Sequence, residues 1–170
     1  CQGESCDYDE VLLQDLDRYL QNSAQDKNFV VLHQSGSHGP SYFKKYPERF
    51  AAFKPVCRSV ELQQCTNDEL INAYDNSVLY TDHFLNRVIE LLKTFQQPTV
   101  MLYVSDHGES LGEYGLYLHG TPYSIAPDVQ KKVPFIVWTS DQFKKQRGID
   151  NADMGKGSSY SHDNVFHSVM

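Results

Sequence analysis

Apolar residues recur along the chain with two kinds of spacing. Helical spacing covers residues 8–24, where Val11, Leu16 and Leu20 fall on one face, and a longer stretch from Thr66 to about Phe95. Thr66 and Glu69 form a capping box that predicts the start of the second helix. Continuous apolar runs of strand length occupy Asn28–His33, Thr99–Ser105 and Val133–Thr139.

The segments between these elements are polar or irregular. Loops are expected over 34–39 and, rich in glycine, over 106–128, and residues 140–159 are expected to be polar and mobile. A last helix is predicted to begin near Ser161, its N-cap. Strands without polar alternation, separated by helices, predict an α/β fold whose mostly parallel sheet is sandwiched by helices. In such sheets ligands bind beyond the carboxyl ends of the strands.

Length and charge limit the classes of protein to consider. The 170 residues suit one domain or a large piece of one, and 40% hydrophobic content argues against disorder. Lys and Arg number 15 against 22 Asp and Glu, and this net charge of −7 argues against a nucleic-acid binder, which normally shows a basic face. The apolar runs fall short of the roughly 18 residues that span a bilayer. Since the chain opens at Cys1 and closes within an apolar stretch, we expect a fragment of a longer protein.

The four cysteines lie in two close pairs, Cys1 with Cys6 and Cys57 with Cys65. Four cysteines allow three connectivities, of which local pairing within each couple is the simplest. Two short disulfide loops would place the chain in an oxidising compartment. The alternative is four unrelated buried thiols.

Candidate chemistry lies in the loops that follow the predicted strands. Asp106 and His107 come directly after the strand Thr99–Ser105, and a carboxylate beside an imidazole is a natural pair of zinc ligands. His38, Glu109 and His119 lie in the same kind of loop. The alternative readings are ordinary: a lone loop histidine is commonly a hydrogen-bonding group, and Asp is frequent in turns.

The remaining histidines carry weaker expectations. His33 is expected to be structural within its strand, His83 to lie on the polar surface of the long helix, and His167 to serve packing or lie on the surface. His162 stays open, because a helix N-terminus can face an active site. No GxSxG, P-loop or GxGxxG motif is present, so neither a hydrolase elbow nor a nucleotide cradle is predicted.

Several of these motifs together resemble one bacterial enzyme family. They are SDHGESLGE at 105–113, YLHG at 117–120, SHGP at 37–40, NAYDN at 72–76 and SHDN at 161–164. The set resembles the signature of phosphoethanolamine transferases, above all the lipid A-modifying branch that includes the mobile colistin-resistance enzymes. The resemblance implies a sulfatase-like fold of the alkaline phosphatase superfamily, with residues 1–170 forming the C-terminal portion of a periplasmic catalytic domain.

The resemblance also implies roles for the candidate residues. Asp106 and His107 would bind a catalytic zinc ion, while His38, Glu109 and His119 would line the phosphoethanolamine pocket. His38 and His119 could also hold a second zinc. The family's nucleophilic threonine, a glutamate ligand and the transmembrane helices would all precede Cys1.

The implied activity is zinc-dependent transfer of phosphoethanolamine from phosphatidylethanolamine to a lipid A phosphate. It would proceed through a phospho-threonine at the periplasmic face of the inner membrane and confer polymyxin resistance. Three alternatives stay open: transfer to another surface glycan, a sulfatase- or phosphodiesterase-type hydrolase, and, for the isolated chain, an inactive zinc-binding piece.

Overall fold

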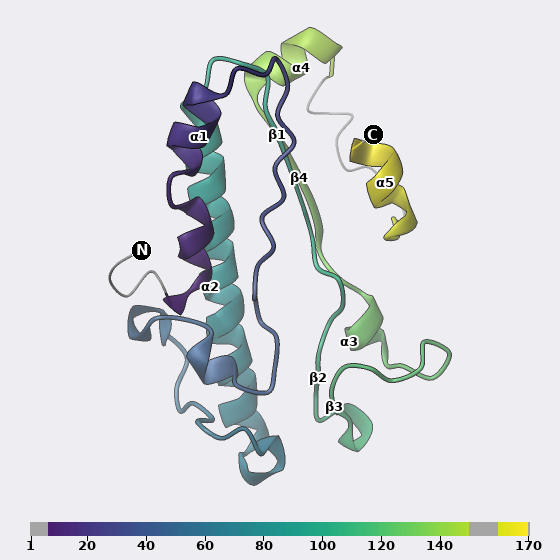
Figure 1. The fold of residues 1–170 in the computed structure, drawn as a ribbon. Coiled ribbons are helices and arrows are strands. Elements are labelled where there is room, and N and C mark those ends of the chain that lie inside the picture. The colour runs from purple at the N-terminus through teal and green to yellow at the C-terminus, as the bar shows by residue number, and fades with distance from the viewer. Residues whose placement is uncertain (1–6, 150–159, 170) are drawn as a thin grey trace. The chain divides into compact units, whose positions relative to one another are not determined.

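The computed structural model, drawn in Figure 1, describes residues 7–149 and 160–169. These residues form two compact units. The first unit contains the described residues up to Leu91 together with Glu109–Leu118, and the second contains Leu92–Gly108 together with those from His119 onward. No helix within these ranges is long and apolar enough to cross a membrane. Cys1 and Cys6, whose pairing the sequence predicts, lie outside the described residues.

Helix α2, Asn67–Lys93, is the framework of the first unit (Figure 1). The predicted capping box is confirmed: the Thr66 backbone N–H donates to the Glu69 carboxylate at 2.9 Å, and the Glu69 N–H donates to the Thr66 hydroxyl at 3.3 Å. These bonds satisfy backbone groups that the first helical turn leaves unpaired. The buried apolar face of α2 consists of Leu70, Ala73, Tyr80, Phe84 and Val88.

The irregular segment after residue 40 packs on α2 through large aromatic side chains. It contains three short 3₁₀ helices: η3 (Tyr42–Lys44), η4 (Glu48–Phe50) and η5 (Leu62–Gln64). Tyr42 and Cys57 join Leu70 in one buried cluster, and Tyr46 joins Tyr80 in a second. The predicted Cys57–Cys65 disulfide is confirmed and closes this segment.

Asn76 connects α2 to the same segment by hydrogen bonds. Its side chain is fully buried, its Oδ1 accepts from the Phe53 N–H at 2.9 Å, and its Nδ2 donates to the Phe53 carbonyl at 2.9 Å and to the Tyr46 hydroxyl at 3.3 Å. One buried amide therefore satisfies both backbone groups of Phe53.

The single helix predicted over residues 8–24 is wrong, because the segment forms two short helices. They are η2 (Asp9–Leu13), a 3₁₀ helix, and α1 (Leu16–Asn22). Between them Asp15 adopts a left-handed backbone with φ +62°, which a right-handed helix cannot include.

His83 is also not the plain surface group that its helical position predicts. Its Nε2 lies 3.3 Å from Oε1 of Glu10, and its ring centroid lies 4.8 Å from that of Phe50. Arg49 reaches the same Glu10 carboxylate at 3.1 Å. The polar face of α2 is therefore covered here by η2 and η4.

The strand predicted over Asn28–His33 is wrong. This segment has no strand structure, and the residues Phe29 and Val31 are 73% and 72% exposed. His33 is exposed as well, so its expected place within a buried strand is wrong. An apolar run indicates a segment that can be covered, but strand structure also needs a neighbour with which to form hydrogen bonds.

The other two predicted strands are confirmed and form the sheet of the second unit. β1 (Val100–Val104) pairs with β4 (Phe135–Thr139), with Val100 opposite Thr139 and Val104 opposite Phe135 (Figure 1). The pairing is antiparallel, and so is every strand pair among the described residues, which corrects the expectation of a mostly parallel sheet. Parallel neighbours need a crossover, usually an α-helix, whereas the only described α-helix between β1 and β4 is the four-residue α3 (Asp128–Lys131).

Two segments expected to be loops contain regular structure. The predicted loop 106–128 includes a small antiparallel pair in the first unit, β2 (Ser110–Leu111) with β3 (Tyr117–Leu118). The polar stretch 140–159 begins with α4 (Asp141–Arg147), and its residues 150–159 are outside the described part. The Ser140 hydroxyl caps α4 by accepting from the Phe143 N–H at 3.2 Å.

The predicted last helix is confirmed as α5, Asp163–Val169. Ser161 caps it as expected, since its hydroxyl accepts from the Asp163 N–H at 3.3 Å.

The role of Asn76 gives a test of the first unit's packing. Asn76→Ala should lower the free energy of unfolding by ~2–4 kcal/mol, because it removes a fully buried amide that bonds both the N–H and the carbonyl of Phe53. Asn72→Ala is the matched control: Asn72 lies one turn earlier and makes a single exposed bond to the Pro55 carbonyl, so its loss should be under ~1 kcal/mol. Urea denaturation measures both, and equal losses would contradict the assigned role.

Candidate functional site

The turn that follows β1 carries the predicted metal pair. The Ser105 hydroxyl donates to the His107 carbonyl at 2.7 Å, and the His107 N–H donates to Oδ1 of Asp106 at 3.0 Å. The side chain of Asp106 is 84% exposed, whereas that of His107 is 28% exposed. Local hydrogen bonds thus hold the backbone of the turn while the carboxylate stays at the surface.

Residue 108 must be a glycine because the backbone of α3 approaches it closely. Its N–H donates to the Gln130 carbonyl at 3.0 Å, and a Cβ at Gly108 would lie 1.9 Å from the carbonyl oxygen of Val129. Its φ is not in the left-handed region, so the sharp backbone turn that glycine would permit is not what the site uses. Residues of α3 therefore press directly on the backbone beside His107.

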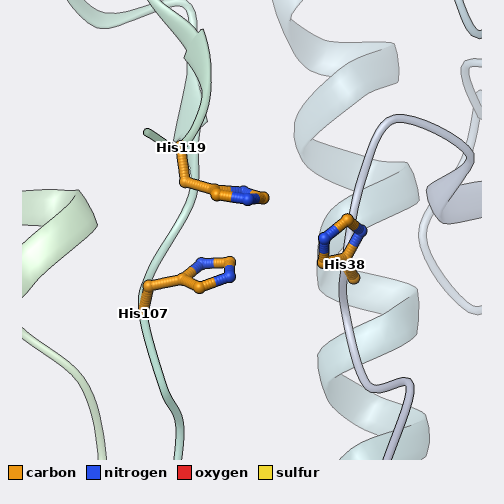
Figure 2. A group of neighbouring side chains, drawn as sticks. All are labelled: His38, His107 and His119. Atoms are coloured by element: carbon orange, nitrogen blue, oxygen red, sulfur yellow. The ribbon is translucent and has the colours of Figure 1, made fainter. Parts of the chain in front are cut away.

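The rings of His107 and His119 stack on each other, as Figure 2 shows. Their centroids are 3.8 Å apart and their planes are inclined by 29°. The chain thus returns to the same place within the second unit after the eleven residues between them. Figure 2 also draws His38, which belongs to the first unit.

His38 and His107 orient their rings by the same local contact. Nδ1 of His38 lies 2.7 Å from the Gly39 carbonyl oxygen, and Nδ1 of His107 lies 3.0 Å from that of Gly108. A carbonyl oxygen only accepts, so Nδ1 carries the proton and Nε2 of the neutral ring carries the lone pair. Histidines that bind metals characteristically fix their tautomer in this way.

The donor set fits a zinc ion. Nε2 of His107 lies 3.7 Å from Oδ2 of Asp106, close to the roughly 3.4 Å that separates two ligand atoms of one tetrahedral zinc. His38, His107 and His119 each offer an imidazole nitrogen of the kind that zinc prefers.

Glu109 takes a different position from its acidic neighbour Asp106. It is 7% exposed within the first unit, where Oε1 accepts from the Gly39 N–H and Oε2 from the Tyr42 hydroxyl, both at 3.2 Å. The sequence predicts Glu109 as part of a pocket wall, and the structure places its carboxylate on the loop that carries His38.

The two C-terminal histidines differ from each other. Nε2 of His162 lies 2.7 Å from the Ser105 carbonyl oxygen, so the start of α5 is attached to the turn that bears Asp106. This contact gives His162 a structural role that the sequence left open. His167 lies on α5 and is exposed, which agrees with the surface alternative.

A simple sequence signal would have singled out the three candidate histidines. Each of them immediately precedes a glycine, whereas none of the other four histidines does. For two of them the structure supplies the reason, because the glycine carbonyl receives the Nδ1 proton and the missing side chain admits close packing.

The fold and these motifs place the chain in a known class. Residues 2–170 match the family model described as Sulfatase, and the chain belongs to this family. The expected sulfatase-like α/β class is thereby confirmed.

Within this family, the chain is similar to several named phosphoethanolamine transferases. The chain is 47% identical over 168 residues to phosphoethanolamine transferase EptA of Salmonella typhimurium, covering 96% of this chain and 30% of that protein. The soluble domain of lipooligosaccharide phosphoethanolamine transferase A from Neisseria meningitidis superposes with a TM-score of 0.89 at 42% identity, over 95% of this chain and 49% of that one. The C-terminal periplasmic domain of phosphoethanolamine transferase EptC from Campylobacter jejuni gives a TM-score of 0.77 at 48% identity, over 83% and 46%.

The predicted resemblance to phosphoethanolamine transferases is confirmed by these matches. The chain spans about a third of the length of the Salmonella relative and about half of each crystallised domain.

The close approach at Gly108 gives a second test. Gly108→Ala should lower the free energy of unfolding by ~3 kcal/mol, because the added methyl group would overlap a backbone carbonyl that cannot rotate away. Gly148→Ala is the control: Gly148 ends α4 with φ +64° and has open space around it, so only a backbone cost of ~1 kcal/mol is expected. Chemical denaturation of both variants compares the two costs, and a loss for Gly108→Ala no larger than the control's would show that α3 does not press on the turn.

Proposed function

We propose that the protein containing this chain transfers phosphoethanolamine from phosphatidylethanolamine to a lipid A phosphate by a zinc-dependent route. The observation that carries the proposal is the match, over nearly the whole chain, to phosphoethanolamine transferases, combined with the paired Asp106–His107 donors at the end of β1. The intermediate is a phospho-threonine whose threonine belongs to the N-terminal part of the catalytic domain.

Asp106 and His107 are the proposed ligands of the catalytic zinc. The exposed Asp106 carboxylate supplies negative charge, and the Gly108 carbonyl holds the His107 ring in the tautomer that presents Nε2. His38 has the same orientation device and, with His119, is proposed to line the phosphoethanolamine pocket or to hold a second zinc. When bound, zinc supplies a Lewis acid that acidifies the nucleophile and balances charge on the phosphoryl oxygens.

The remaining side chains have positioning roles in this proposal. His38 and His119 bind and orient the phosphoryl group, so that the attacking and leaving oxygens are in line. Glu109 fixes the loop of His38 through the Gly39 N–H. His162 attaches α5 to the Ser105 carbonyl next to the metal pair.

The periplasmic face of the inner membrane is the proposed location. The Cys57–Cys65 disulfide needs an oxidising compartment to persist, and the Campylobacter relative is named as a periplasmic domain. Membrane attachment is proposed to come from N-terminal transmembrane helices. Phosphoethanolamine on lipid A masks anionic phosphate, and this loss of negative charge is the proposed basis of polymyxin resistance.

Two further reactions fit related observations. The Neisseria relative is named for lipooligosaccharide, so another surface glycan is an alternative acceptor. The family model is named for sulfatases, which favours a hydrolase in which water takes the place of the acceptor.

The experiment is mass spectrometry of lipid A from a Gram-negative host that expresses the full-length protein. Wild type should add phosphoethanolamine to lipid A, and Asp106→Ala should abolish the adduct, because the zinc shell loses its carboxylate. Asp26→Ala, at an exposed loop aspartate of the first unit, is the matched control and should leave the adduct unchanged.

The outcomes separate the three reactions. An adduct on core sugars instead of lipid A would support the glycan acceptor, and release of free phosphoethanolamine without an adduct would support the hydrolase. An undiminished adduct from Asp106→Ala would reject the proposed metal pair.

A further inference from the structure

Tyr42 lies at the contact point of three backbone segments, each of which continues into a candidate histidine. The first segment contains Gly39, which follows His38. The second contains Glu109, and the third contains Leu118 at the end of β3. All three segments and Tyr42 belong to the first unit, so their contacts are internal to it.

The contacts among these segments are close. A Cβ at Gly39 would lie 2.5 Å from Cδ2 of Leu118 and 2.6 Å from the Tyr42 hydroxyl oxygen. Glu109 accepts from the Gly39 N–H and from the Tyr42 hydroxyl, both at 3.2 Å. The backbone of Gly39 is therefore held between a tyrosine, a carboxylate and an apolar side chain.

Covalent connectivity extends this arrangement to the histidines. His38 is the residue before Gly39, His119 is the residue after Leu118, and His107 is two residues before Glu109. A shift of one segment of the first unit would therefore displace the start of a histidine-bearing stretch by a similar amount.

Tyr42 is suited to fix these segments because it is itself rigidly held. It is 1% exposed, belongs to the buried cluster with Leu70 and Ala73 of α2, and packs edge-on against Tyr74 with ring centroids 5.5 Å apart. Burial, and then the neighbouring Glu109 carboxylate, raise the pKa of Tyr42 well above its ordinary value. The phenol thus keeps its proton and remains a hydrogen-bond donor.

We propose that Tyr42 is a positioning residue for the candidate histidines: through Glu109, Gly39 and Leu118 it holds the first-unit ends of the backbone segments that continue into His107, His38 and His119. The role rests on the proposed zinc function of these histidines. Tyr42 contacts no reacting group in this assignment, and its effect passes through the loops.

The test compares two buried tyrosines in the full-length protein. Tyr42→Phe removes the hydroxyl that donates a hydrogen bond to Glu109. Tyr46→Phe removes a buried hydroxyl whose only described hydrogen bond is the one it accepts from Asn76. Both variants should lose similar stability. Zinc affinity is measured by competition with a chromophoric chelator, and cobalt(II) substitution reports the ligand geometry through its visible spectrum.

We expect Tyr42→Phe to weaken zinc binding about 10-fold and to change the cobalt spectrum, with Tyr46→Phe matching wild type in both. Should Tyr42→Phe fail to fold, Glu109→Gln provides the second variant, since it keeps the shape of the side chain while weakening both charge-assisted bonds, and a similar loss of affinity is expected.

Equal zinc affinities and equal cobalt spectra for Tyr42→Phe and Tyr46→Phe would overturn the positioning role alone. A wild-type protein that binds no zinc would overturn the proposed zinc function, and the positioning role with it. The positioning role would be supported if Tyr42→Phe binds zinc more weakly but still transfers the same group to lipid A.

Discussion

The burial of the Glu109 carboxylate is the constraint on which the loops of the first unit depend. A carboxylate inside a protein costs several kcal/mol unless hydrogen bonds replace its water. The Gly39 N–H and the Tyr42 hydroxyl supply such bonds, one to each oxygen. Because Tyr42 in turn packs on α2, the position of the His38 loop depends on this helix as well as on the loop's own sequence.

Glycine links this packing to the chemistry of the histidines. At Gly39 and Gly108 a Cβ would overlap neighbouring atoms, at 2.5 Å and 1.9 Å respectively, so the backbone can approach closely only without a side chain. The carbonyl of the same glycine receives the Nδ1 proton of the preceding histidine. At His38 and His107, one glycine therefore fixes both the place of the loop and the tautomer of the imidazole, so the His–Gly pair carries more information than histidine alone.

The parts of the fold that could be predicted from sequence are those that local interactions determine. The capping box at Thr66 and the apolar periodicity after it predict α2 almost to its ends, and the runs before Asp106 and Ser140 predict β1 and β4. Strand direction, the exposure of Phe29 and the break at Asp15 could not be predicted, because each depends on which segments meet in space. The helix α4 was missed for a different reason: its polar sequence has no apolar stripe, and only Ser140 and Gly148 mark its ends.

In the candidate site, too, local sequence predicts some features, and others depend on which segments meet in space. Sequence identifies Asp106 and Glu109 as acidic residues three positions apart, and nothing in their spacing tells their roles apart. The structure separates them by exposure: the side chain of Asp106 is 84% exposed, whereas Glu109 is 7% exposed. An exposed carboxylate can exchange water for a cation at little cost, while a buried one must already have its donors in place before any ligand arrives. Exposure therefore supports the proposal that Asp106 binds a metal ion and that Glu109 holds the loop that carries His38.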